Sequence, residues 1–372
     1  MAGAIAKALA CLALPVYAAA PIGIFEDHAD VGTVLHTGSA DFDAVKRTYT
    51  IAGSGENMWL AADAFQFAWK KVSGDVTLTT DISFVGSGGE AHRKAVLMIR
   101  QSLDADSPYA DVARHGDGLT SLQARDEKGG NTTEIRSAAN APARVRIAKR
   151  GDYFYIWVAA AGEDLQFSGG SMRVPMHDPF YVGIGVCSHN KDAVEKAVFS
   201  NVDLTAGASA EAAPPKLYST LELAPLSGDR RVLYVSPGRL TAPSWTKDGA
   251  GLVFLRDGHS ERIPVAGGKP SVETGRIETT EEQPVARELP SDGFRNFSAR
   301  LSPDGAQIAF LSFAGNQTAI PEDQDVLLRV LTVKDGKVRV LAKLVGGKGT
   351  MDAPSWSPDS RRLAFVSYQW IQ

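Results

Sequence analysis

Three stretches of the chain repeat nearly the same residues, and this repeat constrains the fold more than any other feature. They are 243–249 (PSWTKDG), 300–305 (RLSPDG) and 354–360 (PSWSPDS), and their aspartates Asp248, Asp304 and Asp359 lie 56 and 55 residues apart. Each is followed by an apolar run with a Phe six residues after the Asp. Repeats of this kind are typical of propellers and solenoids, in which one unit cannot bury its faces alone.

The repeated residues predict a strand, a tight turn and a second strand in each unit. Pro presets φ, the Asp side chain holds the turn, and Gly tolerates a left-handed corner. Residues 308–312 (IAFLS) then alternate as a strand does. We expect Trp245 and Trp356 to pack between neighbouring units. The residues that define the turns are Trp245, Asp248, Pro303, Asp304, Trp356 and Asp359.

Residues 19–205 carry the period-2 alternation of short strands. Residues 76–84 and 95–100 are two such runs. Residues 144–147 lead through a turn at 149–152 into 153–158, which predicts a hairpin. No amphipathic helix of ten or more residues is expected here. Many strands separated by turns are typical of a β-sandwich.

The chain divides into four expected segments, of which the sandwich at 19–205 is the second. Residues 1–18 have the short apolar stretch and small residues of an export signal. Residues 206–216, rich in Ala, Gly and Pro, suit a flexible-to-extended linker. Residues 217–372 hold the repeats, and the two strands predicted within 217–235 are expected to complete the last unit, which has only two strands of its own. This predicts a partial propeller of about three blades.

The bulk properties exclude some classes of function. A net charge of −4 in 372 residues gives no support to nucleic-acid binding. The apolar stretch at the start is too short to span a bilayer, so no membrane-spanning segment is expected. Removal of the export signal would leave Cys187 as the single cysteine, in a predicted buried strand, and therefore no intrachain disulfide.

Both parts of the chain resemble known families. The Ser-Pro-Asp-Gly units, matched best at 301–310 and 355–365, resemble the repeats of TolB-like periplasmic β-propeller proteins. Residues 95–103 and the hairpin at 144–158 resemble concanavalin A-like (laminin G-type) jelly-roll sandwiches, which occur beside such propellers and in some carbohydrate-active enzymes. The resemblance implies an all-β chain, a sandwich followed by a partial propeller, in the periplasm or secreted.

The resemblance to TolB-like proteins also raises a question about ring closure. Those propellers have six blades, so this chain departs from the family by about three blades. A homodimer that completes a six-blade ring, an open arc and a truncated form are the alternatives.

Catalysis receives little support from the sequence. Ser54, Ser87 and Ser171 lie among glycines, but none has the flanking residues of a nucleophile elbow. Acids cluster around His115, where they could form turns, catalyse sugar hydrolysis or, at Asp104, Asp106 and Asp111, bind calcium. The seven histidines are dispersed with no pair at ligand spacing, so no metal site and no cofactor are predicted. The clustered acids are Asp104, Asp106, Asp111 and Asp117.

Carbohydrate binding is the sharper expectation for the sandwich, because sugar faces stack on exposed aromatic rings. Tyr153, Tyr155 and Trp157 alternate along one predicted strand and so share a face, although packing in the core is the alternative. Tyr109 is another aromatic candidate. Arg100 and Arg114 are charged candidates that could instead be solvated rims.

We therefore expect an exported, non-catalytic binding protein. Its sandwich would bind a glycan or a protein surface, and its blades would be an interaction platform. A glycoside hydrolase that uses acids of the sandwich is the runner-up hypothesis. A structural partner of other envelope proteins is the third.

Overall fold

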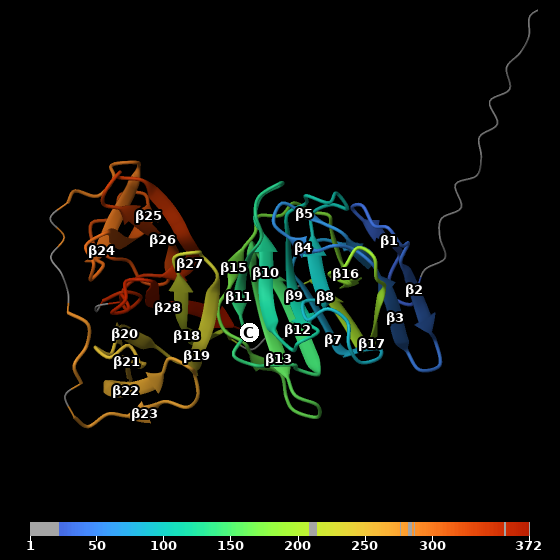
Figure 1. The fold of residues 1–372 in the computed structure, drawn as a ribbon, viewed down its shortest axis with the longest axis horizontal. Helices are drawn as coiled ribbons and strands as arrows, with labels where there is room; N and C mark the ends of the chain where they lie inside the picture. The colour runs from blue at the N-terminus through green and yellow to red at the C-terminus, as the bar shows by residue number, and fades with distance from the viewer. Residues whose placement is uncertain are drawn as a thin grey trace, which may run out of the picture.

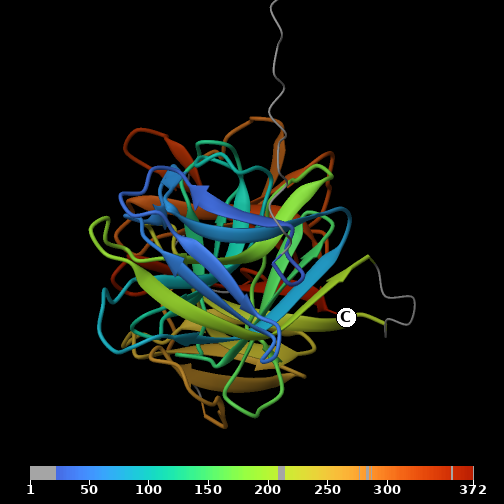
Figure 2. The same ribbon diagram turned by 90° about the vertical axis from the view of Figure 1, so that its right-hand side faces the viewer.

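The computed structural model describes residues 22–207, 214–275, 277–281, 285, 287–352 and 355–371. Every regular secondary-structure element within these residues is a β-strand, which confirms the all-β prediction. The expected export signal and residues 208–213 of the expected linker lie outside the described residues. Figure 1 shows the sandwich on the right and the blades on the left, and Figure 2 looks from the sandwich end with the blades behind it.

The first sheet of the sandwich has seven strands from the N-terminal part of the chain. Its strands pair in antiparallel fashion throughout this part. In spatial order they are β1 (Asp27–Val31), β6 (Phe65–Val72), β16 (Phe180–Cys187), β8 (Lys94–Arg100), β9 (Tyr109–His115), β10 (Thr120–Arg125) and β11 (Thr133–Arg136).

The second sheet lies against the first and contains the predicted hairpin as β12 and β13, paired from Arg144↔Ala159 to Arg150↔Tyr153. In spatial order its strands are β14 (Gln166–Phe167), β13 (Tyr153–Ala159), β12 (Arg144–Arg150), β7 (Val76–Phe84), β17 (Glu195–Ala206), β3 (Thr48–Gly53) and β2 (Ser39–Asp43). The short β15 (Met172–Arg173) also pairs with β13, and β4 (Met58–Trp59) pairs with β5 (Ala62–Asp63).

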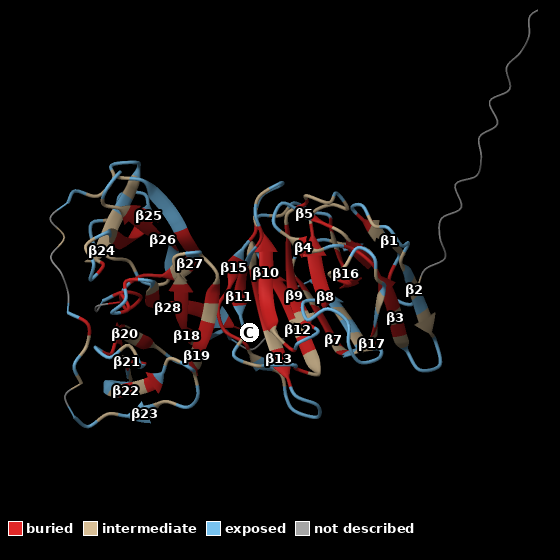
Figure 3. Cartoon of the chain, in the orientation of Figure 1, coloured by how far each residue is buried: buried red, intermediate tan, exposed pale blue. Residues whose placement is uncertain are grey.

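The middle of the first sheet is buried on both faces, as the red strands β8, β9 and β10 of Figure 3 show. Leu97 and Ile99 of β8 face the second sheet and join the main core with Phe154 and Ile156. The alternate residues, such as Met98, belong to a second apolar cluster on the outer face, which includes Met58 of β4. Alternate residues of a strand face opposite sides, so β8 is buried along its whole length.

The repeats form two four-stranded blades and a third, composite blade. The composite blade takes strands from both ends of residues 217–372. β28 pairs with β18 from Lys216↔Ile371 to Pro225↔Arg362, the arrangement expected for a blade completed by 217–235. Blade one is β20 (Leu240–Trp245), β21 (Gly251–Arg256), β22 (His259–Pro264) and β23 (Ser271–Val272). Blade two is β24 (Phe294–Leu301), β25 (Gln307–Ala314), β26 (Gln324–Thr332) and β27 (Val338–Gly346). The composite blade is β19 (Arg230–Pro237), β18 (Lys216–Pro225) and β28 (Arg362–Ile371).

The composite blade lies between the other two. Trp245 of blade one is fully buried in one cluster with Tyr368 of β28, while Trp356 is buried in another with Leu328 of blade two. The Trp356 indole N–H also donates to the Arg300 carbonyl at 2.9 Å. Both tryptophans therefore pack where the repeat predicts, between adjacent units.

The three repeat turns have the same hydrogen bonds. Asp248 and Asp304 each accept from the hydroxyl two residues earlier at 2.6 Å, and Asp359 accepts from Ser357 at 2.5 Å. Each aspartate also accepts from a backbone N–H two residues later, at 3.0–3.1 Å. Gly305, which follows Asp304 in the second turn, has φ +72°, the left-handed corner that favours glycine. Local chemistry thus fixes each turn.

The sandwich and the blades share one continuous sheet. β11 of the sandwich pairs in parallel with β19 of the composite blade, at Ile135↔Arg230 and Arg136↔Arg231. The first sheet therefore runs on into the composite blade as ten strands. Parts that the sequence predicted as separate units across a linker are joined edge to edge.

Candidate functional site

A groove lies on the outer face of the first sheet, where the β4–β5 segment and the turn between β18 and β19 border it. We call this hollow of about 290 Å³ the outer groove. Residues of the sandwich make most of its wall, and Asp229 comes from the blades. Its polar lining comprises Asn57, His92, Lys94, His115, Gln123, Glu134, Arg136, His189 and Asp229, and its apolar lining Trp59 and Leu119.

The floor of the outer groove is made of polar side chains that are almost entirely buried. Lys94, Gln123 and Glu134 expose 2%, 1% and 4% of their surface. The Lys94 ammonium donates to the Met58 carbonyl at 2.8 Å and to Gln123 Oε1 at 3.3 Å. Burial lowers the pKa of Lys94, and Asp111 opposes that shift. Desolvating such groups costs free energy, so a sheet face that carries them is a candidate for function.

Asp111 of β9 lies directly opposite Gln123 in the sheet and is a fully buried carboxyl. Among the described residues neither of its side-chain oxygens has a hydrogen-bond partner. Burial raises the pKa of Asp111 well above its usual value, and Lys94 acts in the opposite direction. A buried polar group without a partner is uncommon in folded proteins.

A buried ion cluster fixes the β4–β5 segment over the sheet. Arg125 Nη2 lies 2.8 Å from Asp63 Oδ1, and its Nη1 donates to Asp63 Oδ2 at 3.0 Å. Arg100 Nη2 reaches the same Oδ2 at 3.4 Å. The segment carries Trp59, whose ring centroid lies 5.4 Å from the Lys94 ammonium. An aromatic ring is thereby held at the wall of the groove.

Two predicted ligand-binding residues belong to this buried cluster. Arg100, a candidate ligand-binding residue with a solvated rim as the alternative, is not at a rim, because its side chain is fully buried against Asp63. The expectation of an exposed ring is also wrong for Tyr109, which is fully buried, with its hydroxyl 3.1 Å from Thr132 Oγ1. Arg114 is half-buried and donates to the Ile82 carbonyl of β7 in the second sheet.

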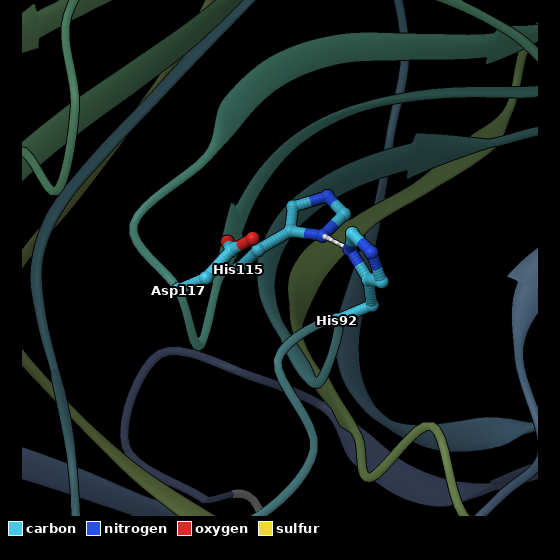
Figure 4. A group of neighbouring side chains, drawn as sticks. All are labelled: His92, His115 and Asp117. Atoms are coloured by element: carbon cyan, nitrogen blue, oxygen red, sulfur yellow. Dashed lines mark hydrogen bonds between the residues drawn. The ribbon is translucent and has the colours of Figure 1, made fainter.

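Three histidines meet beside the groove, which corrects the prediction that the histidines are dispersed. His92 precedes β8, His115 ends β9, and His189 follows β16. The Nδ1 atoms of His92 and His115 are 3.4 Å apart (Figure 4). The ring centroids of His92 and His189 are 5.7 Å apart. Burial, followed by Lys94, lowers the pKa of His115 to about 3. No sequence spacing could reveal this group, because neighbouring strands in the sheet bring it together.

Two carboxylates face each other across the junction of the sandwich and the blades. Glu134 of β11 pairs with Arg136. Burial and the charge of Glu134 raise the pKa of Asp229, which precedes β19. Neither acid stood out in the sequence.

The acids that cluster in the sequence do not form one site. Asp104 and Asp106 are ion-paired with Lys128 at 2.6 and 3.5 Å on the surface. Asp111 is buried in β9, so these three do not make the expected calcium cage. Asp117 lies instead beside the histidines. Within the described part of the chain, the group whose potential ligand atoms converge is His92, His115 and Asp117.

The predicted aromatic stripe lies on the outer face of the second sheet, against the blades. Phe154 and Ile156 of the same strand face the core, so Tyr153, Tyr155 and Trp157 do not. Tyr153 donates to Asp325 of blade two. Tyr155 and Trp157 line a notch of about 250 Å³ together with Trp370, Arg150 and Asp75. The stripe therefore belongs to the junction, apart from the outer groove.

Cys187 and the membrane prediction can also be compared with the structure. Cys187 is fully buried, as predicted, and burial raises its pKa to about 11.

In the part of the chain that the structure describes, no helix has the length and apolar character needed to cross a bilayer.

No protein-family model matches the chain. The uncharacterized protein Atu1656 of Agrobacterium fabrum is 29% identical over 142 residues, which are 38% of this chain and 44% of that protein. The match thus spans less than half the length of this curated relative.

Solved structures resemble the chain weakly. A functionally unknown protein from Saccharomyces cerevisiae aligns with 46% of this chain and 93% of its own (17% identity, TM-score 0.37). A protein assigned as TolB from Agrobacterium tumefaciens aligns with 80% of this chain and 99% of its own, at 13% identity and a TM-score of 0.22. Mouse laminin α1 domains LG4–5 align with 90% of this chain and 84% of their own, at 9% identity and a TM-score of 0.21. Both families that the sequence resembles are among these neighbours, but the sandwich-and-blade architecture itself rests on the strand pairing above.

Proposed function

We propose that this chain is an exported, non-catalytic binding protein whose outer groove holds a glycan and whose blades present surfaces to other proteins. The observation that carries the proposal is the buried polar floor of Lys94, Gln123 and Glu134 beside Trp59. Sugar hydroxyls both donate and accept hydrogen bonds, and this floor offers donors and acceptors side by side. The Trp59 ring supplies an apolar face on which a sugar ring can stack.

A glycan panel with the full chain tests the proposal, followed by calorimetry on any glycan retained. Trp59→Ala should weaken binding about tenfold, because it removes the stacking ring. Trp370→Ala is the matched control, since this tryptophan is exposed and lines the junction notch instead. Loss of binding in Trp370→Ala with Trp59→Ala unaffected would move the site to the notch and contradict the groove.

A carbohydrate-active enzyme is the second candidate, favoured by the carboxylate pair. Glycoside hydrolysis needs one protonated acid and one ionised carboxylate. Burial, followed by the charge of Glu134, raises the pKa of Asp229. The retained glycan should therefore also be assayed for release of reducing ends. Turnover that disappears in Asp229→Asn while binding persists would replace the binding proposal by the enzyme.

The blades complete the proposal as a platform for partners. A second copy of the chain that completes a larger ring is one such partner. Molar mass in solution tests this part, and a monomer at micromolar concentration would exclude the homodimer.

A further inference from the structure

We propose that His92, His115 and Asp117 bind one divalent transition-metal ion of the zinc class at the wall of the outer groove. The inference does not depend on glycan binding, because it starts from the positions of these three side chains (Figure 4).

The two imidazoles already have the spacing that a shared ion requires. Zinc binds nitrogen at about 2.0–2.1 Å with tetrahedral angles, so two nitrogen ligands of one ion lie about 3.3–3.4 Å apart. The Nδ1 atoms of His92 and His115 are 3.4 Å apart. An oxygen of Asp117 lies within 4.8 Å of these nitrogens. Asp117 is exposed, so its side chain can close the remaining distance of about 1.4 Å at most.

Backbone hydrogen bonds hold the ligand loops together. The Gly116 N–H donates to the Arg93 carbonyl, and the Asp117 N–H donates to the Ala91 carbonyl, both at 2.9 Å. The Leu119 N–H donates to Asp117 Oδ1 at 3.0 Å and orients the carboxylate. A site whose ligands are oriented by such supporting bonds loses little entropy when the ion binds.

A third imidazole gives a separate sign that this cluster has unused ligand capacity. His189 has φ +56°, a strained conformation for a residue other than glycine. Its Nδ1 is buried and has no hydrogen-bond partner among the described residues. Strained backbone and unpartnered polar atoms both concentrate at functional sites.

The protons of the cluster can be accounted for when the ion binds. Lys94 donates to Gln123 Oε1, so the Gln123 amide nitrogen, 3.3 Å from His115 Nε2, donates to that ring. His115 then carries its proton on Nδ1 and donates it to His92 Nδ1. An ion between the two Nδ1 atoms would require the His115 proton on Nε2, and the Gln123 side chain would turn so that its Oε1 accepts that proton. Lys94 would then lose Gln123 Oε1 as an acceptor. Lys94 keeps the Met58 carbonyl at 2.8 Å.

The chemistry of the ligands selects the kind of ion. Two imidazoles and one carboxylate suit zinc, cobalt, nickel or copper, whereas calcium and magnesium prefer oxygen ligands alone. Three protein ligands leave the fourth position of a tetrahedral ion for water or a bound molecule.

Zinc titration of the full chain without a polyhistidine tag tests the site. We expect one Zn²⁺ per chain by calorimetry, and Co²⁺ should give the visible absorption of a tetrahedral complex. His92→Ala should weaken Zn²⁺ binding at least tenfold. His92 is exposed, so this variant should fold with an unchanged Tm. His259→Ala, which removes an exposed imidazole on blade one, is the control and should bind as the parent chain does.

Two results would overturn the site. One is the absence of saturable Zn²⁺ binding by the parent chain. The other is binding that His92→Ala and Asp117→Asn leave unchanged, since that ion would be held elsewhere. Glycan binding is measured separately in metal-free buffer, so a failure of the metal site is distinguishable from a failure of the glycan proposal.

Discussion

Replacement of Asp63 by asparagine should be among the most destabilising single changes in the sandwich. The Asp63 side chain is fully buried and is the ion-pair partner of both Arg100 and Arg125. The substitution would remove the negative charge, and the new amide N–H₂ group would face guanidinium donors. Both positive charges would stay buried without their counterion.

The size of the effect follows from burial. Removing one partner of a buried ion pair costs about 3–5 kcal/mol, because an uncompensated charge remains in the interior. The nearby pair of Lys128 and Asp104 provides the contrast, since their ammonium and carboxylate are 2.6 Å apart but each side chain is 59% exposed. Solvent screens such a pair, so Lys128→Ala should cost at most about 1 kcal/mol.

Urea unfolding followed by tryptophan fluorescence measures both variants. Hydrogen exchange over residues 57–63 adds a local readout, and we expect it to rise in Asp63→Asn because the β4–β5 segment loses its anchor. If Asp63→Asn lost less than about 1 kcal/mol, like Lys128→Ala, the assignment of this cluster as the anchor of the groove wall would be refuted.

Two further predictions concern a buried thiol and a repeat turn. Burial raises the pKa of the Cys187 thiol from an ordinary value of 9 to about 11. The thiol therefore ionises at a lower pH in the unfolded chain than in the folded chain. The free energy of unfolding should fall as pH rises above 9, by about 1.4 kcal/mol at pH 10. Cys187→Ala should remove that part of the slope in urea unfolding at pH 8 and 10, and an unchanged slope would contradict it. Asp304→Ala should cost about 1–2 kcal/mol, since the carboxylate accepts from Ser302 and from the Ala306 N–H, and thermal unfolding with Asp335→Ala as an exposed-turn control measures it.

Local chemistry explains what the sequence could predict. The turn at Asp304 depends on residues within two positions of the aspartate, so the motif alone indicates it. The hairpin at 144–158 likewise depends on one short turn and alternation. The composite blade followed from counting strands, because a final unit with two strands needs partners.

The outer groove could not be predicted in the same way. Residues 95–100 suggested alternation, but β8 is covered on both faces, and the cover comes from the distant β4–β5 segment. The pairing of His92 with His115 depends on the adjacency of β8 and β9 in the sheet. Tyr and Arg are residue types common at binding surfaces, which made Tyr109 and Arg100 candidates. The β4–β5 segment covers both side chains and buries them.

The groove also depends on the continuity between the sandwich and the blades. Arg230, beside Asp229, is buried, lies 3.2 Å from Glu222 and donates to the Ser171 carbonyl of the sandwich at 2.8 Å. These contacts and the β11–β19 pairing place Asp229 opposite Glu134. A fragment that ended before β18 would expose the edge of β11 and lose one wall of the groove. The two parts therefore make a single binding surface, and the ligand specificity of the sandwich should be a property of the joined chain.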